Sequence, residues 1–220
     1  MIEDPTLERV LARALRTGGE FAEVFAEDKQ SGNATLDDGR VEQLSSGRDR
    51  GAGIRVVVGD TTGFAHTADL SEQGLLTAAE AASAAAREGG GGVREIALTR
   101  RDVANPSPVS VLPDDVPKAD KVAILRQADE AARAAAREIS QVTASVAGSR
   151  RRILVANSDG LLTTDDQVRT LFSVSAVATG DTGMQTGRKS TGLTIGWELF
   201  DRIDVDEFAA EAAQMAITKL

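Results

Sequence analysis

Apolar residues recur at helical spacing in four stretches of the chain and at strand-like spacing between them. The first stretch begins at Asp4-Pro5, an acidic residue before a proline in the first helical turn. Ser71 precedes a second stretch in the position of an N-cap, and Asp204 precedes the last. The pattern predicts four helices, which run from Asp4 to Gly18, Ser71 to Arg87, Ala119 to Arg137 and Asp204 to Leu220.

The stretches between these helices alternate and contain turn residues, which predicts short strands. Asp38-Gly39 is a strong hairpin signal because both positions tolerate a positive φ, and Asp159-Gly160 resembles it. The strands are expected at 21–26, 34–36, 40–44, 53–58, 62–66, 93–98, 141–147, 153–156, 168–178 and 191–197. Short turns between strands, with helices at the ends of each run, predict an α+β fold. We expect two modules of antiparallel sheet with packed helices.

A proline-rich segment separates the two halves of the chain. Four of the five prolines lie between residues 105 and 117, where they prevent a helix or a central strand. We interpret residues 101–117 as a connector between a first module at 1–100 and a second at 118–220. Gly89–Gly92 is expected to be a flexible joint. The last predicted helix reaches Leu220 without a stop signal, which indicates that the chain is the front part of a longer protein.

The composition narrows the class of protein. The net charge of -9 disfavours nucleic acid and membrane surfaces as partners. The absence of cysteine excludes disulfides, thiolate metal ligands and a cysteine nucleophile. The first residues lack the pattern of a signal peptide, and no apolar run has the length of a membrane span. These features predict a soluble, cytoplasmic protein.

Individual residues offer little chemistry. His66 is the single histidine, and a triad or a zinc site requires partners that the sequence does not place beside it, so a structural or surface role is favoured. Gly183–Ser190 resembles a phosphate-binding loop, but a strand pattern follows it where that motif needs a helix, which favours a polar hairpin.

The charged and aromatic clusters are also better explained by structural roles than by catalysis or binding. Neighbouring residues on a strand point to opposite faces, so two adjacent acidic residues seldom share a catalytic site, and turn formation explains them better. The adjacent acidic pairs are Asp37-Asp38, Asp114-Asp115 and Asp165-Asp166. Arg150–Arg152 is interpreted as a solvated strand end rather than a nucleic-acid patch. Trp197 and Phe200 could line a pocket, but core packing is favoured. The residues alone identify no catalytic, cofactor-binding or metal-binding position.

Several stretches together resemble the TldD branch of the TldD/PmbA peptidases, a family once called modulators of DNA gyrase. The resemblance is carried by Gly51–Val56 with Thr62–Ala65 and Asp69–Ser71, Asp120–Arg126, Gln141–Ser145, Ile153–Gly160, Val168–Val177, Gly192–Gly196 and Trp197–Phe200. Each block is weak by itself, but their order and spacing cover nearly the whole chain.

The resemblance implies two amino-terminal modules of a zinc metallopeptidase that acts on unfolded peptides, with two subunits enclosing a chamber. In that family a His-Glu-x-x-x-His motif and a downstream cysteine bind zinc in a carboxyl-terminal domain. This sequence has no second histidine and no cysteine, so no catalytic or metal residue is carried over, and zinc is expected only in the missing domain.

The implied partner is a TldD/PmbA-type subunit in a homo- or heterodimer. Two alternatives remain open: a stand-alone, non-enzymatic docking partner of a full-length homologue, and an unrelated module that binds a small molecule.

Overall fold

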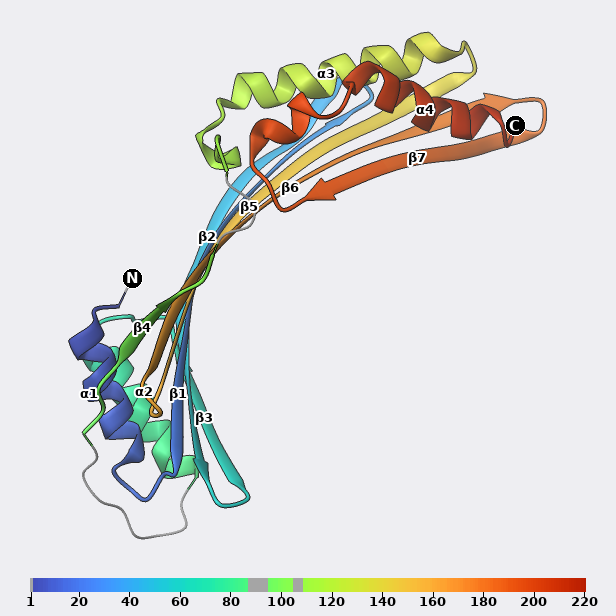
Figure 1. Cartoon of the computed structure of the whole chain (residues 1–220). Helices are drawn as coiled ribbons and strands as arrows, with labels where there is room; N and C mark the ends of the chain where they lie inside the picture. The colour runs from blue at the N-terminus through green and yellow to red at the C-terminus, as the bar shows by residue number, and fades with distance from the viewer. Residues whose placement is uncertain (1, 87–94, 105–108) are drawn as a thin grey trace. The chain divides into compact units, whose positions relative to one another are not determined.

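All four predicted helices are present in the computed structural model, which describes residues 2–86, 95–104 and 109–220 (Figure 1). The Ser71 hydroxyl accepts a hydrogen bond from the N–H of Gly74 at 3.2 Å, and Asp204 caps its helix through the N–H groups of Asp206 and Glu207. The helices are α1 Asp4–Leu15, α2 Glu72–Ala85, α3 Lys118–Ala135 and α4 Val205–Ile217, with short 3-10 turns η1 Pro113–Asp115 and η2 Trp197–Asp201.

The strands are fewer and longer than predicted. They are β1 Phe21–Asp37, β2 Arg40–Val58, β3 Thr61–Thr67, β4 Thr99–Asp102, β5 Ile139–Asn157, β6 Leu161–Gly180 and β7 Gly183–Leu193. The separate strands expected at 21–26 and 34–36 are both part of β1. Those at 40–44 and 53–58 are part of β2, and those at 141–147 and 153–156 are part of β5.

These errors in the predicted strand lengths arose at polar segments. The composition of these segments is typical of loops, but in the structure their backbone stays extended. Strand pairing uses backbone groups, and a polar segment keeps it when its side chains find partners across the sheet. On β5, Arg151 pairs with Glu27 of β1, and Arg152 Nη2 lies 2.6 Å from Asp28 Oδ2. The prediction that Arg150–Arg152 is a solvated strand end is therefore wrong: the run lies in the middle of β5.

Three smaller predictions also differ. Of the strand expected at 93–98, the described residues 95–98 are irregular, and the strand nearby is β4. Residues 194–197 leave the sheet, because β7 ends at Leu193 and η2 begins at Trp197. The spacing of Met215 from Phe208 and Ala212 in α4 predicts that it lies in the core, but 42% of its surface is exposed. The joint at Gly89–Gly92 and residues 105–108 of the connector lie outside the described residues.

The strand order is β3-β2-β1-β5-β6-β4, and β7 also pairs with β6. β2 with β3 and β6 with β7 are antiparallel hairpins, whereas β4 runs parallel to β6, from Thr99 opposite Leu161 to Asp102 opposite Thr164. The predicted α+β class is confirmed.

The chain forms two compact units, each assembled from three segments. Unit 1 contains Met1–Lys29, Asp49–Asn105 and Arg151–Asp166; unit 2 contains Gln30–Arg48, Pro106–Arg150 and Gln167–Leu220. Strands β1, β2, β5 and β6 each contribute residues to both units. The predicted modules at 1–100 and 118–220 are each continuous in sequence, whereas each compact unit is built from separate segments. The two divisions describe different things, so the module boundaries stay a prediction.

Each unit has its own core beneath a pair of helices. In unit 1, α1 contacts α2, and Leu7, Leu11 and Ile54 are among the fully buried side chains. In unit 2, α3 and α4 lie side by side over the strands, above buried Phe172 (Figure 1). The alternation of apolar residues along 168–178 predicts one inward face for this strand, which is confirmed because Val168, Phe172, Val174, Ala176 and Ala178 are all buried.

The two units repeat one order of elements. Unit 1 follows α1-β1-β2-β3-α2, and the corresponding order in unit 2 is α3-β5-β6-β7-α4. In each, the last strand of the series packs against the helix that follows it, β3 against α2 and β7 against α4. A repeat that sequence identities did not establish is therefore visible in the order of elements.

None of the helices in the described parts of the chain combines the length and the apolar character that a membrane crossing requires.

Candidate functional site

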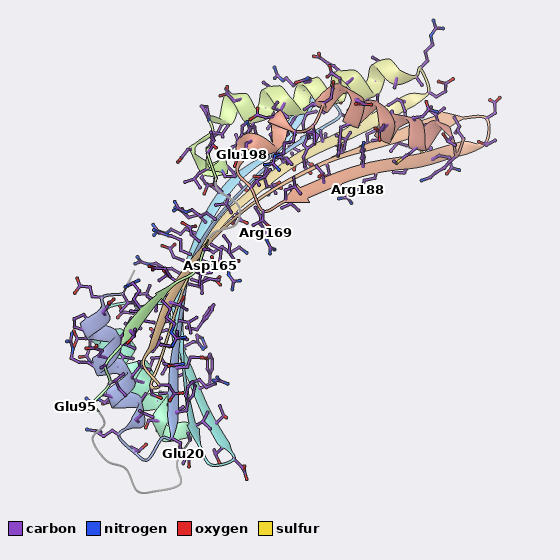
Figure 2. The ribbon with its side chains drawn as sticks, in the orientation of Figure 1. Glu20, Glu95, Asp165, Arg169, Arg188 and Glu198 are labelled. Carbon is purple, nitrogen blue, oxygen red and sulfur yellow. The ribbon has the colours of Figure 1, made fainter. Side chains whose placement is uncertain are left out.

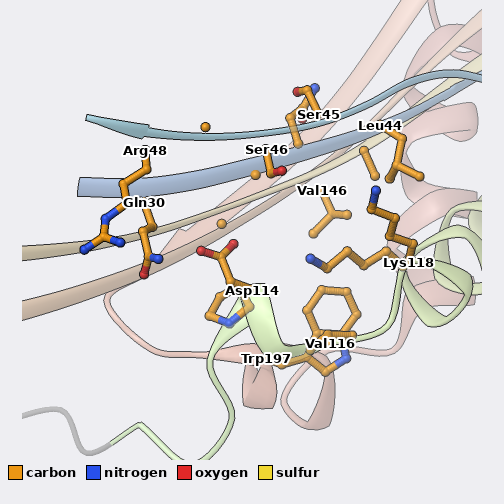
Figure 3. A pocket seen from close by; sticks show the side chains of 17 residues that line it. Gln30, Leu44, Ser45, Ser46, Arg48, Asp114, Val116, Lys118, Val146 and Trp197 are labelled. Carbon is orange, nitrogen blue, oxygen red and sulfur yellow. The ribbon is translucent and has the colours of Figure 1, made fainter. Parts of the chain in front are cut away.

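A pocket of about 430 Å³ lies in unit 2, where η1 and the start of α3 meet the strands (Figure 3). Asp114, Lys118 and Trp197 lie on one side of it, and Ser45 and Ser46 of β2 lie on the opposite side. Its full lining is Gln30, Gly32, Asn33, Ala34, Leu44, Ser45, Ser46, Gly47, Arg48, Pro113, Asp114, Val116, Lys118, Lys121, Val146, Gly148 and Trp197.

Small residues on the strands allow η1 to approach the sheet. A side chain at Gly148 would place its Cβ 2.4 Å from Cβ of Pro113, and one at Gly32 would lie 3.3 Å from Oδ1 of Asp114. Pro113 is itself buried, so it anchors η1 on β5. Asp114, next along the chain, is exposed and contributes its carboxylate to the pocket lining.

The pocket lining is more basic than acidic. Lys118 and Lys121 are three residues apart on α3, a spacing that places both on one face of a helix. Together they supply two cationic side chains, against the single carboxylate of Asp114. Because the whole chain carries a net charge of -9, this local positive balance favours an anionic or carboxylate-bearing occupant.

Glu198 holds the segment that leads into η1. Its carboxylate accepts hydrogen bonds from the backbone N–H groups of Ser110 at 3.2 Å, Val111 at 3.3 Å and Gly196 at 3.1 Å. The N–H of Trp197 also donates to the carbonyl oxygen of Val111 at 2.8 Å. Figure 2 labels Glu198, which lies in η2. The contacts of Glu198 and Trp197 therefore hold residues 110 and 111 of the connector against η2, beside the pocket.

These contacts predict a pH-dependent contribution of Glu198 to stability. Burial alone would raise the pKa of Glu198, but the hydrogen bonds from its own N–H and those of Gly196, Ser110 and Val111 outweigh burial, and its pKa lies below the usual 4.5. A carboxyl group with a lowered pKa stabilises the fold above its unfolded-state pKa, and this contribution is lost as the pH falls through the folded-state pKa.

Glu198→Gln is therefore expected to unfold at lower urea concentration than the parent protein at pH 7, with the difference shrinking as the pH falls below about 4.5. Urea titrations at pH 7, 5, 4 and 3 measure it. Glu138→Gln is the matched control and should show little difference, because Glu138 is exposed and the hydrogen bond it accepts, from the N–H of Thr179 at 2.8 Å, goes to its backbone carbonyl oxygen. A pH-independent difference for Glu198→Gln would contradict the assigned role of the carboxylate.

His66 lies apart from this pocket, in unit 1. It is exposed on β3, and its ring stacks with Phe64 at 6.3 Å between centroids. Both line an apolar hollow of about 520 Å³ that also includes Phe25. Across residues 2–86, 95–104 and 109–220, no group of three or more histidine, cysteine, aspartate or glutamate side chains is placed to hold a metal ion.

Other predicted features have structural roles. Phe200 contacts buried Phe172, with ring centroids 5.3 Å apart, as core packing predicted. Trp197 packs against the same core and also lines the pocket. The phosphate-loop-like segment Gly183–Ser190 forms the start of β7, opposite β6, so the predicted polar hairpin is confirmed.

The neighbouring acids Asp37 and Asp38 bind different partners. Asp37 accepts hydrogen bonds from the Thr143 hydroxyl and the Gln141 amide, which lower its pKa. Asp38 accepts from Nη2 of Arg133 at 2.6 Å. The two carboxylates therefore bind partners on different elements, β5 for Asp37 and α3 for Asp38.

The sequence did not identify the pocket residues Lys118, Lys121 and Asp114. The connector was interpreted as a spacer, and two lysines in a first helical turn are common on solvent-exposed faces. The available signal was the pair of glycines, Gly32 and Gly148, which lie just outside the predicted strands at 34–36 and 141–147 but inside β1 and β5 of the structure. A glycine in a strand often marks a close approach by another segment, here η1.

Solved structures share this two-unit α+β fold. A Bacteroides thetaiotaomicron protein described as a modulator of DNA gyrase matches with a TM-score of 0.80 at 15% identity, covering 100% of this chain and 51% of the other. TldE from Thermococcus kodakarensis matches with a TM-score of 0.70 at 14% identity, covering 95% of this chain and 46% of TldE.

Two family models match the chain in succession. The PmbA/TldA metallopeptidase domain 1 matches residues 22–86, and the PmbA/TldA metallopeptidase central domain matches residues 112–220. A metalloprotease of Methanothermobacter thermautotrophicus is 27% identical over 205 residues, covering 91% of this chain and 43% of the relative. A metalloprotease TldD homologue of Haemophilus influenzae is 27% identical over 210 residues, with the same coverage.

The fold and the paired domain matches define the class: a chain that carries domain 1 and the central domain of the PmbA/TldA metallopeptidases, one after the other. The chain belongs to the PmbA/TldD family. It spans less than half the length of the curated relatives it matches.

Proposed function

We propose that this chain is the non-catalytic amino-terminal part of a TldD-like zinc metallopeptidase that degrades unfolded peptides. In this role it supplies chamber wall and subunit interface, and the zinc chemistry belongs to a further domain. The proposal includes a TldD/PmbA-type partner subunit and a cytoplasmic location.

The observation that carries the proposal is the succession of domain matches. Domain 1 and the central domain account for residues 22–86 and 112–220, and the curated metalloproteases extend to more than twice the length covered. The sequence has one histidine and no cysteine, so it cannot supply two histidines and a cysteine to zinc. The pocket residues offer lysine, arginine and aspartate side chains, which can bind a peptide but do not form an activated nucleophile with a base.

The first test is the nucleotide sequence that follows the codon for Leu220. An in-frame continuation that encodes His-Glu-x-x-x-His supports the proposal. A stop codon in that place would overturn it in favour of the stand-alone docking partner, which would act only through a full-length homologue.

The second test compares residues 1–220 with the product of any longer reading frame. We expect the 220-residue chain to bind no stoichiometric zinc by metal analysis and to leave unfolded casein peptides intact, whereas the longer product binds zinc and cleaves them. A chelator such as 1,10-phenanthroline should abolish that cleavage. Chelator-sensitive cleavage by the 220-residue chain alone would contradict the assignment of catalysis to another domain.

A further inference from the structure

Half of the phenylalanines of this chain lie outside the two hydrophobic cores. The sequence contains six, and Phe172, Phe200 and Phe208 pack in the core of unit 2. The others belong to unit 1, where Phe25 is 37% exposed and Phe64 is 60% exposed. Apolar side chains that gather on a surface mark sites of interaction or ligand binding, so the outer face of unit 1 is a candidate for such a site.

Two glycines of β2 make room between the exposed rings. Gly51 and Gly53 share the outer face of β2, because Ala52 between them is buried. In the register of β2 with β3, Gly53 lies opposite His66. A Cβ at Gly53 would lie 2.9 Å from the ring of Phe64, so this ring lies over bare backbone. The missing side chains therefore leave part of the space that forms the apolar hollow.

The size and the walls of the apolar hollow fit a small molecule. It has a volume of about 520 Å³ and lies wholly within unit 1. Its aromatic walls are Phe25 on β1 and both Phe64 and His66 on β3. A hollow of this volume, with aromatic walls and few polar groups to fix orientation, is typical of sites for small ligands. Aromatic walls favour a guest with a ring of its own, because rings in contact attract beyond the area that they bury.

The charges of the lining favour a guest with a positive charge. Arg151 pairs with Glu27. Hydrogen bonds from the N-cap residue of α2, followed by the charge of Arg50, lower the pKa of Asp69, so Arg50 acts on a carboxylate outside the hollow. Asp49 also lines the hollow and forms no hydrogen bond or ion pair with any other described residue. A cation on the guest would complement this carboxylate.

We propose that the apolar hollow of unit 1 binds a small aromatic amine, with its ring between Phe25 and Phe64 over Gly53 and its ammonium group beside Asp49. The ammonium group also gains from the faces of the aromatic walls. The site binds its ligand without cleaving it and requires no metal, so it does not depend on the proposed peptidase function.

Charge disfavours a second copy of this chain as the occupant. Pairing two copies through this face would bring two Asp49 carboxylates together, which is unfavourable. Neither copy would supply a free cation from the walls, because Arg151 lies 5.9 Å from the centre of the Phe25 ring and already pairs with Glu27. A small aromatic amine brings the cation that this surface lacks.

The experiment follows the backbone amide signals of the isotope-labelled 220-residue protein during titration with tryptamine. Matched probes are indolepropionate, which has a carboxylate in place of the ammonium group, and hexylamine, which has no ring. We expect saturable shifts of the Gly51 and Gly53 signals with tryptamine and a dissociation constant on the order of 1 mM, as for other ligands of this size. Both matched probes should bind about tenfold more weakly.

Protein variants test the ring and the charge separately. Phe64→Ala removes a largely exposed wall and should weaken tryptamine binding about fivefold without unfolding unit 1. Asp49→Asn should weaken it about threefold and reduce the preference for tryptamine over indolepropionate to about threefold. The controls are Asp60→Asn, in the turn between β2 and β3, and Leu171→Ala, on β6 in unit 2. Both residues are exposed and lie outside the hollow, so binding should not change.

Four results would overturn the proposal. The first is no saturable shift with tryptamine at up to ~10 mM. The second is binding of indolepropionate or hexylamine as tight as that of tryptamine. The third is saturable binding that leaves the Gly51 and Gly53 signals in place, or that Phe64→Ala and Asp49→Asn do not weaken. The fourth is a dimer of the parent protein that Phe64→Ala dissociates, which would make a second copy the occupant.

Discussion

Replacing Gly187 by alanine is expected to destabilise unit 2 strongly, and replacing Gly63 by alanine should do the same to unit 1. A Cβ at Gly187 would lie 2.1 Å from the carbonyl oxygen of Ala212 and 2.5 Å from the backbone nitrogen of Ala216. At Gly63 it would lie 2.0 Å from the carbonyl oxygen of Ala82. These neighbours are helix backbone, so α4 or α2 must move away from its strand.

Such overpacking costs about 3 kcal/mol or more when backbone must shift. For a chain of this size that corresponds to a fall in melting temperature of roughly 10 °C. Differential scanning calorimetry measures the fall. Hydrogen exchange should place the lost protection of Gly63→Ala in α2 and β3, and that of Gly187→Ala in α4 and β7, because each unit has a separate core.

Gly47→Ala is the matched control. Gly47 also lies in a long strand, but an added Cβ there would meet no atom within 4 Å. The control should melt within about 2 °C of the parent protein, as expected for a surface substitution that costs under ~0.5 kcal/mol. If Gly63→Ala and Gly187→Ala melted like the control, the close helix-to-strand packing described for both units would be wrong.

The second large effect is expected at Arg133, which joins α3 to the turn between β1 and β2. Its Nε donates to the carboxylate of Asp129 at 3.1 and 3.2 Å, and its Nη2 donates to Asp38. Asp129 is only 7% exposed. The hydrogen bond to Asp129, followed by that to Asp38, raises the pKa of Arg133 despite its partial burial. Arg133→Met would leave the Asp129 carboxylate nearly buried without its cation.

Losing one partner of a buried pair costs 3–5 kcal/mol, and because Arg133 is itself one-third exposed we expect about 2 kcal/mol. Urea denaturation at pH 7 measures this loss. The control is Arg9→Met, because Arg9 and Glu72 form an ion pair with 52% and 43% of their side chains exposed, and it should shift the urea midpoint far less than Arg133→Met does.

A double variant separates charge from packing. The double variant Arg133→Met with Asp129→Leu also removes the carboxylate that Arg133→Met alone leaves nearly buried without a cation. It should therefore recover much of the stability lost by Arg133→Met alone. Equal losses for the single and double variants would show that packing of the Arg133 side chain, rather than its charge, stabilises this end of α3.

Local signals in the sequence were sufficient for the helices and the turns. Ser71 and Asp204 cap helices through contacts within three residues, so their effect does not depend on the rest of the fold. Asp38 and Gly39 both have a positive φ, the backbone conformation that their residue types predicted. Composition alone also decides that this chain, with one histidine and no cysteine, cannot supply the His-Glu-x-x-x-His motif and cysteine that the resemblance implies.

The sequence by itself therefore determined the α+β class, the helix positions, the hairpin turns and the family. The tertiary structure decided the continuity of the long strands, because Arg152 meets Asp28 from a position far along the chain, and backbone pairing then holds polar residues extended. It also decided the pocket, which joins residues of β1, β2, η1, α3 and β5. Contacts between distant segments leave no periodic pattern in a single sequence, so only the folded chain brings Lys118 and Lys121 into one pocket with residues 44–48 of β2.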